Sequence, residues 1–347
     1  MSQKVKWGVI GSGGIARRRT IPEGILPAVN AELRVVYDLD QKANQAVADQ
    51  YAARPAASVA ELLEAGIDAV YIATPPSVHC EHTVAVARAG KHVLCEKPLG
   101  MTVAEAVRML AECREHRVLL GTAFMMRFHA QHQAALELVR AGKLGKLVFG
   151  RAQLSCWYPP LPGAWRQDPL AGGGGALMDM GGHCIDLLEM FFGRPRAVSC
   201  LIHQTVHAYA AEDSAVATLF FENGALAVVD AFFCVPDAAS RNALELYGSE
   251  GSILAANTIG QGSLGEMTAY LNEQSAGYDA HQARAATGGR SIQPAPVNIY
   301  RAEIEEFGQA ILDHREPSHN AAIGVRSQEV LAACYESARA GRVVRIG

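Results

Sequence analysis

A glutamate and a lysine stand where a buried strand is expected to end, and both are suited to proton and charge chemistry. The apolar run from His92 to Cys95 indicates the strand, and Glu96, Lys97 and Pro98 follow it directly. Ligands of open α/β sheets bind beyond the carboxyl ends of the strands. An ion pair at the end of a buried strand is costly unless something there uses it. The segment therefore predicts a ligand site at Lys97. A strand-end ion pair with no further role is the alternative.

A second group of ionisable residues follows the four glycines at 172–175. Asp179, His183 and Asp186 lie at the start of an expected helix that is apolar on most sides and therefore buried. His183 and Asp186 are three residues apart and share a helix face. Because the reference pKa of histidine lies near neutrality, a buried His beside carboxylates can accept and donate a proton. The alternative is that Asp186 satisfies His183 for architecture alone.

A glycine-rich turn near the N-terminus indicates a site for a pyrophosphate. An expected strand at 5–10 leads into a G-x-G-x-x-A turn made of Gly11, Ser12, Gly13, Gly14, Ile15 and Ala16, and a helix follows. Gly11 allows the tight turn, and Gly13 lets the backbone approach the phosphates, which the helix N-terminus favours. The strand before the turn and the helix after it are the context that a dinucleotide site requires. Arg17 to Arg19 are interpreted as solvated helix charges in preference to phosphate ligands. Pro22 is expected to end or kink the helix.

An acid at the end of the second expected strand bears on the choice of cofactor. Asp38 lies 22 residues after Ala16, which suits a contact with the adenosine ribose hydroxyls. A carboxylate there would repel a 2′-phosphate by on the order of a few kcal/mol. NAD is therefore expected in preference to NADP. Asp40 competes for this role, but Asp38 is nearer the strand end.

A rigid loop follows the expected strand at 68–73. Thr74, Pro75 and Pro76 should line the cofactor groove, because they lie at a strand's carboxyl end and proline restricts the backbone. His79 and His82 are three residues apart and could be read as a metal pair. No third ligand lies nearby in the sequence, so no metal is expected.

The composition is that of an ordinary globular protein. The chain has 347 residues, which favours two domains, and its 31 Lys+Arg against 35 Asp+Glu include no basic block that predicts a nucleic-acid partner. The eight cysteines are scattered without a Cys-x-x-Cys pair, which favours reduced thiols in the cytoplasm. A strand is expected within five residues of the N-terminus, so no signal peptide is expected. No apolar run reaches membrane-spanning length.

The pattern of expected elements changes near residue 124. Residues 1–123 alternate strand and helix, which predicts a dinucleotide-binding Rossmann domain with a doubly wound parallel sheet (α/β). Residues 124–347 predict a substrate-binding and oligomerisation domain (α+β) with a mostly antiparallel open sheet, its strands expected at 147–157, 197–207, 215–221, 225–233 and 242–247. Helices at 300–312 and 321–339 should pack back on the first domain, and the stretch 255–296 should be a long loop near the cleft. A partner subunit often covers one face of such a sheet, so a homodimer or homotetramer is expected.

Four segments together resemble the Gfo/Idh/MocA family of sugar and polyol oxidoreductases over essentially the whole chain. They are residues 11–16, 71–75 (Tyr-Ile-Ala-Thr-Pro), 90–98 (ending in Glu-Lys-Pro) and 179–186 (Asp-Met-Gly-Gly-His-Cys-Ile-Asp). Trp165-Arg166 and residues 246–251 are similar to anhydrofructose-reductase-like members and related monosaccharide dehydrogenases. The resemblance implies an NAD(P)-dependent dehydrogenase or reductase that acts on a CH–OH group of a monosaccharide, sugar derivative or cyclitol.

The resemblance also implies a role for each matched residue. Lys97 would bind the reacting oxygen near the nicotinamide, Asp179 would hold the sugar, and His183 would move the hydroxyl proton. The expected cofactor contacts are Gly11, Ser12, Gly13, Gly14, Ile15, Asp38, Thr74, Pro75, His79, Glu96, Lys97, Trp165, Arg166 and Tyr300. The expected substrate contacts are Lys97, Arg127, Tyr158, Asp179 and His183.

Two departures from the family pattern bear on the substrate and the cofactor. Relatives with Ser or Arg at the position of Asp38 use NADP, and anhydrofructose reductases show Asn where this chain has Ala123. Two alternatives stay open. One is a non-catalytic NAD-binding protein, and the other is a family enzyme that uses tightly held NAD to open a glycosidic bond.

Overall fold

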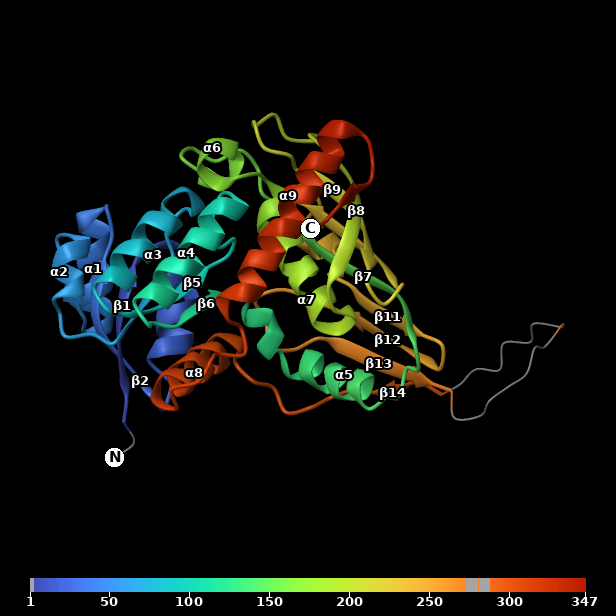
Figure 1. Cartoon of the computed structure of the whole chain (residues 1–347), viewed down its shortest axis with the longest axis horizontal. Helices are drawn as coiled ribbons and strands as arrows, with labels where there is room; N and C mark the ends of the chain where they lie inside the picture. Colours follow the sequence, from blue (N-terminus) through green and yellow to red (C-terminus); the bar gives the residue numbers. More distant parts are fainter. Residues whose placement is uncertain (1–2, 273–279, 281–287) are drawn as a thin grey trace.

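The first sheet is built from the N-terminal third of the chain. The computed structural model describes residues 3–272, 280 and 288–347 (Figure 1). Six parallel strands are arranged in the order β3-β2-β1-β4-β5-β6. They are β1 Val5–Ile10, β2 Ala31–Tyr37, β3 Arg54–Pro55, β4 Ala69–Ile72, β5 His92–Glu96 and β6 Leu120–Ala123. Their helices are η1 Ala16–Ile25, α1 Gln41–Tyr51, α2 Val59–Leu63, η2 Pro76–Val78, α3 His79–Arg88 and α4 Val103–Glu115. The expected doubly wound parallel sheet is confirmed.

Apolar strands position the first half of the site. Val93, Leu94 and Cys95 of β5 are fully buried, because helices cover both faces of a parallel sheet. The strand order reverses between β1 and β4, so the loops after these two strands leave the sheet edge in opposite directions. Such a reversal opens a crevice for a ligand beside the carboxyl ends of β1, β4 and β5.

Of the two outcomes expected at Pro22, an end or a kink of the first helix, the end does not occur. Pro22 does not end the helix, because η1 is a π-helix that continues through Pro22 to Ile25. The wider turn of a π-helix relieves the clash between the proline ring and the preceding carbonyls, so only the missing N–H is lost. Thr20, Ile21 and Ile25 are fully buried and hold this helix against the sheet.

The second sheet has nine strands in the order β14-β13-β12-β11-β7-β10-β9-β8-β15. They are β7 Leu147–Ser155, β8 Pro195–His203, β9 Ser214–Phe221, β10 Leu226–Phe232, β11 Leu244–Gly248, β12 Gly251–Ala256, β13 Glu266–Leu271, β14 Arg290–Ser291 and β15 Val344–Arg345. Among the described strand pairings of this second sheet, only the β7–β10 pair is parallel. The mostly antiparallel sheet is therefore confirmed.

The prediction of one long loop over residues 255–296 is wrong in part. Strands β13 and β14 lie within this stretch, and β12 ends at Ala256. In β13 the small or apolar Met267 and Ala269 are buried while Thr268 and Tyr270 face outward, and the glycines around them obscured this alternation in the sequence. Residues 273–279 and 281–287 lie outside the described residues.

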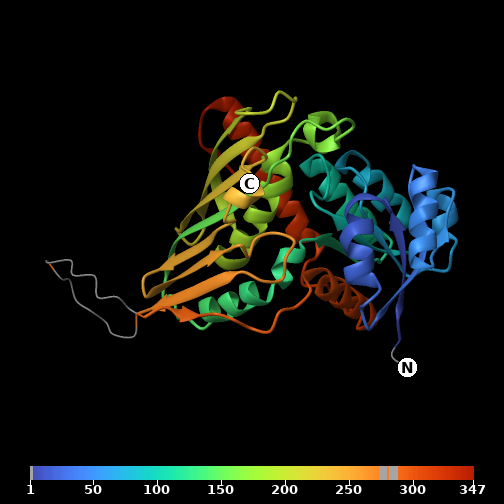
Figure 2. The ribbon, with the colours of Figure 1, turned by 180° about the vertical axis from the view of Figure 1, so that it is seen from behind.

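Helices α5, α7 and α9 lie on one face of the second sheet, between it and the first half of the molecule (Figures 1 and 2). Helix α8 returns to the first sheet, where its Phe307 packs 5.8 Å from Trp7 of β1 between ring centroids. The helical elements that follow β6 are η3 Met125–Phe128, α5 Ala130–Arg140, η4 Trp165–Gln167, α6 Pro169–Gly172, η5 Leu177–Gly181, α7 Gly182–Phe192, η6 Asp237–Ala239, α8 Ile299–Leu312 and α9 Ala321–Ala340.

Two sequence expectations concern features that the whole chain shares. Among the described residues, no helix is long and apolar enough to cross a membrane. All eight cysteines have free thiols, and six of them are buried.

Candidate active site

The carboxyl end of β5 and the start of α7 meet at a cavity of about 190 Å³ between the two sheets. Ten of the residues expected from the sequence line this cavity together, although they come from opposite ends of the chain. They are Gly14, Ile15, Thr74, Glu96, Lys97, Trp165, Arg166, Asp179, His183 and Tyr300.

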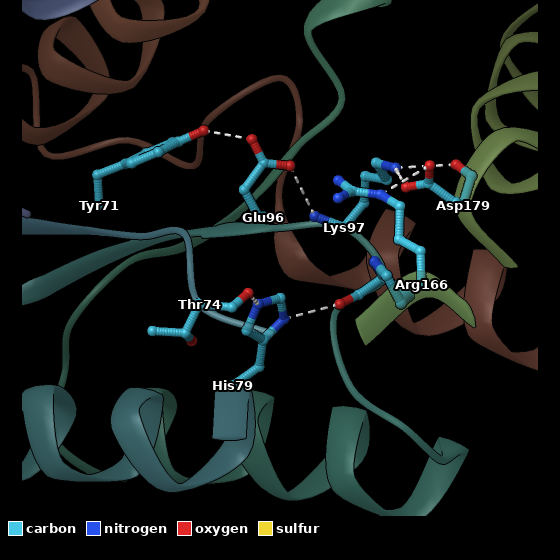
Figure 3. Close-up of polar contacts among 8 residues, drawn as sticks. Tyr71, Thr74, His79, Glu96, Lys97, Arg166 and Asp179 are labelled. Atoms are coloured by element: carbon cyan, nitrogen blue, oxygen red, sulfur yellow. Dashed lines mark hydrogen bonds and ion pairs between the residues drawn. The ribbon is translucent and has the colours of Figure 1, made fainter. Parts of the chain in front are cut away.

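Lys97, Asp179 and Arg166 form the charged centre of the site (Figure 3). The Lys97 Nζ donates to Asp179 Oδ1 at 2.6 Å and to the Asp179 backbone oxygen at 2.8 Å. Arg166 Nε donates to Asp179 Oδ2 at 3.0 Å, and its guanidinium lies 4.0 Å from the centre of the Trp165 ring. Burial alone would raise the pKa of Asp179, but the Arg166 and Lys97 cations outweigh it and hold that pKa well below its usual range. Asp179 is therefore a carboxylate at neutral pH.

The local helix geometry points Asp179 and His183 to the same side. Asp179 lies in η5, a π-helix turn that leads directly into α7, and its backbone N–H donates to Gly175 at 3.0 Å. Wide turns of this kind often occur at functional sites. His183 follows four residues later in α7, and both side chains line the cavity.

His183 is buried and carries a ring nitrogen that no described residue satisfies. Its side chain is 6% exposed, its ring meets Phe124 edge-on, and its Nδ1 has no hydrogen-bond partner among the described residues. Burial and the nearby Lys97 lower the pKa of His183 well below its ordinary value, so the imidazole is neutral at neutral pH. Asp186 instead forms an ion pair with Arg127 at 2.7 Å. The interpretation of Asp186 as the partner of His183 is therefore wrong.

A buried tyrosine forms a hydrogen bond with Glu96. Tyr71 in β4 donates a hydrogen bond to Glu96 Oε1 (Figure 3). It also accepts one from Thr20 Oγ1 at 3.0 Å. Burial raises the pKa of Glu96, while Lys97 and the Tyr71 hydrogen bond oppose that rise. Sequence reasoning gave Tyr71 no role in the site. The available signal was its position in a fully apolar strand, where a buried phenol needs a hydrogen-bond partner.

The glycine-rich turn has the geometry that close approach requires. Gly11 has φ +80°, and a Cβ there would lie 2.8 Å from the backbone of Ala73. Asp38 reaches across the turn and accepts from Gly13 N at 3.0 Å. The competing Asp40 is the N-cap of α1, where its carboxylate accepts from the first backbone N–H groups. This leaves the Asp38 carboxylate beside the turn.

Several expected contacts lie outside the cavity. The hydroxyl of Ser12 is fully buried and donates to Asn44 at 3.1 Å. Each ring nitrogen of His79 is within 2.9 Å of a carbonyl oxygen, one from Thr74 and one from Pro98, so His79 braces the two loops that carry the site (Figure 3). Burial lowers the pKa of His79 to about 4. Pro75 lies just before η2 and does not line the cavity.

The two expected substrate contacts Arg127 and Tyr158 do not line the cavity either. Arg127 is paired with Asp186, and Tyr158 packs against Phe233 with ring centroids 5.1 Å apart. Arg18 also lines the cavity while it stays exposed, which agrees with the interpretation of this residue as a solvated helix charge. The other residues that line the cavity are Ala73, Met125, Met126, Leu154, Met180, Gly260 and Gln261.

The expected site residues do not extend to the other large cavity of the molecule. A larger cavity of about 660 Å³ lies behind the segment 173–178, and none of the expected site residues lines it. Among the described residues no group of three or more His, Cys, Asp or Glu side chains is arranged to hold a metal ion. His79 and His82 therefore form no described metal cluster.

Comparison with known proteins gives matches along nearly the whole chain. Residues 5–124 match the GFO/IDH/MocA oxidoreductase family with the NAD-binding Rossmann fold, and residues 132–254 match a GFO/IDH/MocA C-terminal domain. The 1,5-anhydro-D-fructose reductase of Ensifer adhaerens is 30% identical, over 98% of each chain. The D-xylose 1-dehydrogenase (NADP(+)) 2 of Haloferax volcanii is 30% identical, over 98% of this chain and 99% of that one. The crystal structure of an aldose-aldose oxidoreductase from Caulobacter crescentus complexed with glycerol has a TM-score of 0.88 at 26% identity, covering 99% of this chain and 100% of that one.

Proposed function

Because this chain belongs to the Gfo/Idh/MocA family of NAD-binding oxidoreductases, we propose that it moves a hydride reversibly between the nicotinamide and a carbinol carbon of a monosaccharide, sugar derivative or cyclitol. The observation that supports this most strongly is the meeting of Lys97 with Asp179 and His183 in one cavity. Lys97 directly follows β5, Asp179 lies in η5, and His183 lies at the start of α7. Residues 1–123 would bind the cofactor, and residues 124–347 would supply most of the substrate site.

The residues present fit a bound dinucleotide. The turn at Gly11 brings the backbone close to Ala73 without room for a side chain, which suits a pyrophosphate at the start of η1. Tyr300 lines the cavity, and its hydroxyl is buried without a hydrogen-bond partner among the described residues. A polar atom of this kind is costly to bury unless a ligand pairs with it.

His183 and Lys97 would share the proton and charge chemistry. In the oxidation direction, the neutral His183 would accept the proton of the reacting hydroxyl. An ammonium has three N–H donors, and Asp179 takes two of those of Lys97. The third is available to stabilise the negative charge that develops on the substrate oxygen. Asp179, kept ionised by its two cations, would accept a hydrogen bond from a neighbouring sugar hydroxyl.

NAD is the proposed cofactor in preference to NADP. The support is the Asp38 carboxylate beside Gly13, where a 2′-phosphate would meet negative charge. Titration of the protein with each reduced cofactor, followed by nicotinamide fluorescence, measures this preference. Tighter binding of NADPH than of NADH would refute it.

The outer face of the second sheet is the proposed subunit interface of a homodimer or homotetramer. Leu201 and Val216 pair across β8 and β9 and are 75% and 43% exposed, and Leu226 and Tyr270 on the same face are also exposed. Exposed apolar groups in one patch mark an interaction surface. We place the protein in the cytoplasm, because none of its cysteines forms a disulfide. Light scattering after size-exclusion chromatography tests the assembly, and a monomer with this face unpaired would contradict it.

The decisive experiment is a substrate panel. Monosaccharides, sugar lactones and cyclitols are incubated with the protein and NAD or NADP, or with the reduced cofactors for the reverse reaction, and nicotinamide absorbance is followed. We expect turnover with at least one sugar or cyclitol, and loss of that turnover in His183→Ala by about 10²–10⁴-fold. The proposal fails if no panel member reacts, or if His183→Ala reacts at the wild-type rate.

A further inference from the structure

The four glycines before Asp179 have no part in the chemistry above, and the structure shows what two of them allow. A Cβ on Gly174 would overlap the hydroxyl of Tyr335, and a Cβ on Gly175 would overlap the backbone oxygen of Glu212. A side chain at Gly174 would therefore push the segment away from Tyr335, and a side chain at Gly175 would push it away from Glu212. The glycines therefore let the backbone close around a Glu212–Tyr335 pair.

Glu212 gathers three hydrogen bonds on one oxygen. Its Oε1 accepts from Gly175 N at 2.8 Å, from Leu177 N at 3.1 Å and from the Tyr335 hydroxyl at 2.8 Å. Its backbone oxygen accepts from Ala176 N at 3.0 Å. Glu212 is 7% exposed and comes from the loop between β8 and β9, whereas Tyr335 comes from the middle of α9.

These contacts connect Glu212 to the segment that carries Asp179. The first N–H groups of a helix have no partner within the helix, and a negative charge at that end is favourable. Glu212 satisfies two such groups at the start of η5. The backbone oxygen of Gly175, whose N–H Glu212 holds, accepts in turn from Asp179 N at 3.0 Å. The position of Asp179 is thus set two hydrogen bonds away from Glu212.

We propose that Glu212, with Tyr335 as its hydroxyl donor, is a positioning residue for the hydride-transfer reaction. It fixes the start of η5 and α7, so that the Asp179 carboxylate stays within hydrogen-bond distance of Lys97 and Arg166. Glu212 does not line the catalytic cavity, so its effect passes through Asp179. The inference rests on the proposed function, since it assigns a role within that reaction.

The test compares Glu212→Ala, Glu212→Gln and Tyr335→Phe with a matched control. Asp213→Asn is that control, because the adjacent and fully buried Asp213 accepts from the backbone N–H groups of residues 205–207 and holds a loop outside the site. For each variant we would measure kcat, the KM of the sugar, NAD affinity and the melting temperature.

We expect Glu212→Ala to lower kcat by about ten- to a hundredfold, because a displacement of about 1 Å costs roughly that much, while NAD affinity is kept. Glu212→Gln keeps an oxygen acceptor and should recover most of the loss, with Tyr335→Phe in between. Asp213→Asn should lower the melting temperature without the loss in kcat. The inference is overturned if Glu212→Ala and Asp213→Asn lower kcat alike, or if NAD affinity falls together with kcat. Should Glu212→Ala not fold, Glu212→Gln and Tyr335→Phe against the same control decide the question.

A second readout separates this inference from the proposed function. Asp179 holds the Lys97 ammonium, so displacement of η5 should make that amine more reactive toward an amine-specific reagent. Peptide mass spectrometry measures the labelling, and we expect faster labelling of Lys97 in Glu212→Ala but not in Asp213→Asn. If the wild type oxidises no sugar and the labelling still responds, the proposed function fails and the positioning role stands. If the wild type is active and neither kcat nor labelling responds, the positioning role fails alone.

Discussion

Replacing Lys97 by Met removes a buried cation from the candidate site with little change in side-chain length. The Lys97 side chain is 9% exposed, and its Nζ donates to Asp179 Oδ1 at 2.6 Å and to the Asp179 backbone oxygen at 2.8 Å. Methionine has no donor for the developing charge on the substrate oxygen. Removal of one preorganised donor of this kind typically costs about 10²–10³-fold in kcat, or about 3–4 kcal/mol of barrier. We expect a loss of that size for Lys97→Met.

The same substitution should also lower the free energy of unfolding. Removing one partner of a buried ion pair costs about 3–5 kcal/mol, because the other charge loses its compensation. Asp179 keeps Arg166 at 3.0 Å, so it is not left alone. The loss should therefore lie at the low end, about 3 kcal/mol. Urea denaturation measures it.

The pKa of His183 should also respond to Lys97→Met, and it can be measured without turnover. Lys97 is the largest contribution after burial to the lowered pKa of His183. Lys97→Met should therefore raise that pKa, although burial keeps it below the ordinary value. An NMR titration of the His183 ring measures the shift. In any residual oxidation activity, the loss on the acid side should begin at a higher pH than in the wild type, because the protonated imidazole cannot accept a proton.

The assay uses the substrate found in the panel, with NAD affinity measured separately. Lys143→Met serves as the control, since Lys143 is an exposed lysine in the turn after α5. Turnover near the wild-type rate in a folded, NAD-binding Lys97→Met protein would refute the assignment of Lys97. A pKa of His183 that falls on substitution would refute the electrostatic account.

Three further substitutions test separate parts of the structure. Asp38→Ser should shift affinity from NAD toward NADP, because repulsion worth on the order of a few kcal/mol is removed; Asp40→Asn keeps the helix cap and is the control, and an unchanged affinity ratio would reject Asp38. Gly11→Ala should abolish NAD binding in a fluorescence titration, because its Cβ would lie 2.8 Å from the Ala73 backbone. Gly66→Ala is the control, because Gly66 also has a positive φ, at +66°, but has open space around it. Equal losses of NAD affinity in the two variants would show that backbone strain, and not the close approach to Ala73, is responsible. Burial, with Asp186 nearby, raises the pKa of Glu189 to about 8. Because the folded-state pKa of Glu189 is raised, this residue stabilises the protein in acid, and that stability is lost as the pH rises through about 8. Glu189→Gln should therefore raise the melting temperature at about pH 9 and change it little at about pH 5. An equal shift of the melting temperature at both pH values would contradict this.

Much of the first half of the molecule could be predicted, because its signals are local. Apolar runs of strand length, a glycine turn opening a helix and charged residues at a strand end all depend on neighbours within a few residues. This is why β5 and the position of Lys97 were recognisable. The wrong predictions also had local causes. In the first half, Pro22 was expected to end or kink a helix that continues as a π-helix, and in the second half the glycines around β13 obscured its alternating pattern.

The sequence by itself determined the two sheet types, the glycine turn and which residue types are available for catalysis, since these follow from periodicity and backbone preference. Only the tertiary structure decided which charges pair. Lys97 pairs with Asp179 across 82 residues, and Arg127 rather than His183 pairs with Asp186. Glu212, from the loop between β8 and β9, accepts a hydrogen bond from Gly175 N just before η5. Spacing along the chain does not encode such partners, because they are selected by how the two sheets and their helices pack around one buried cavity.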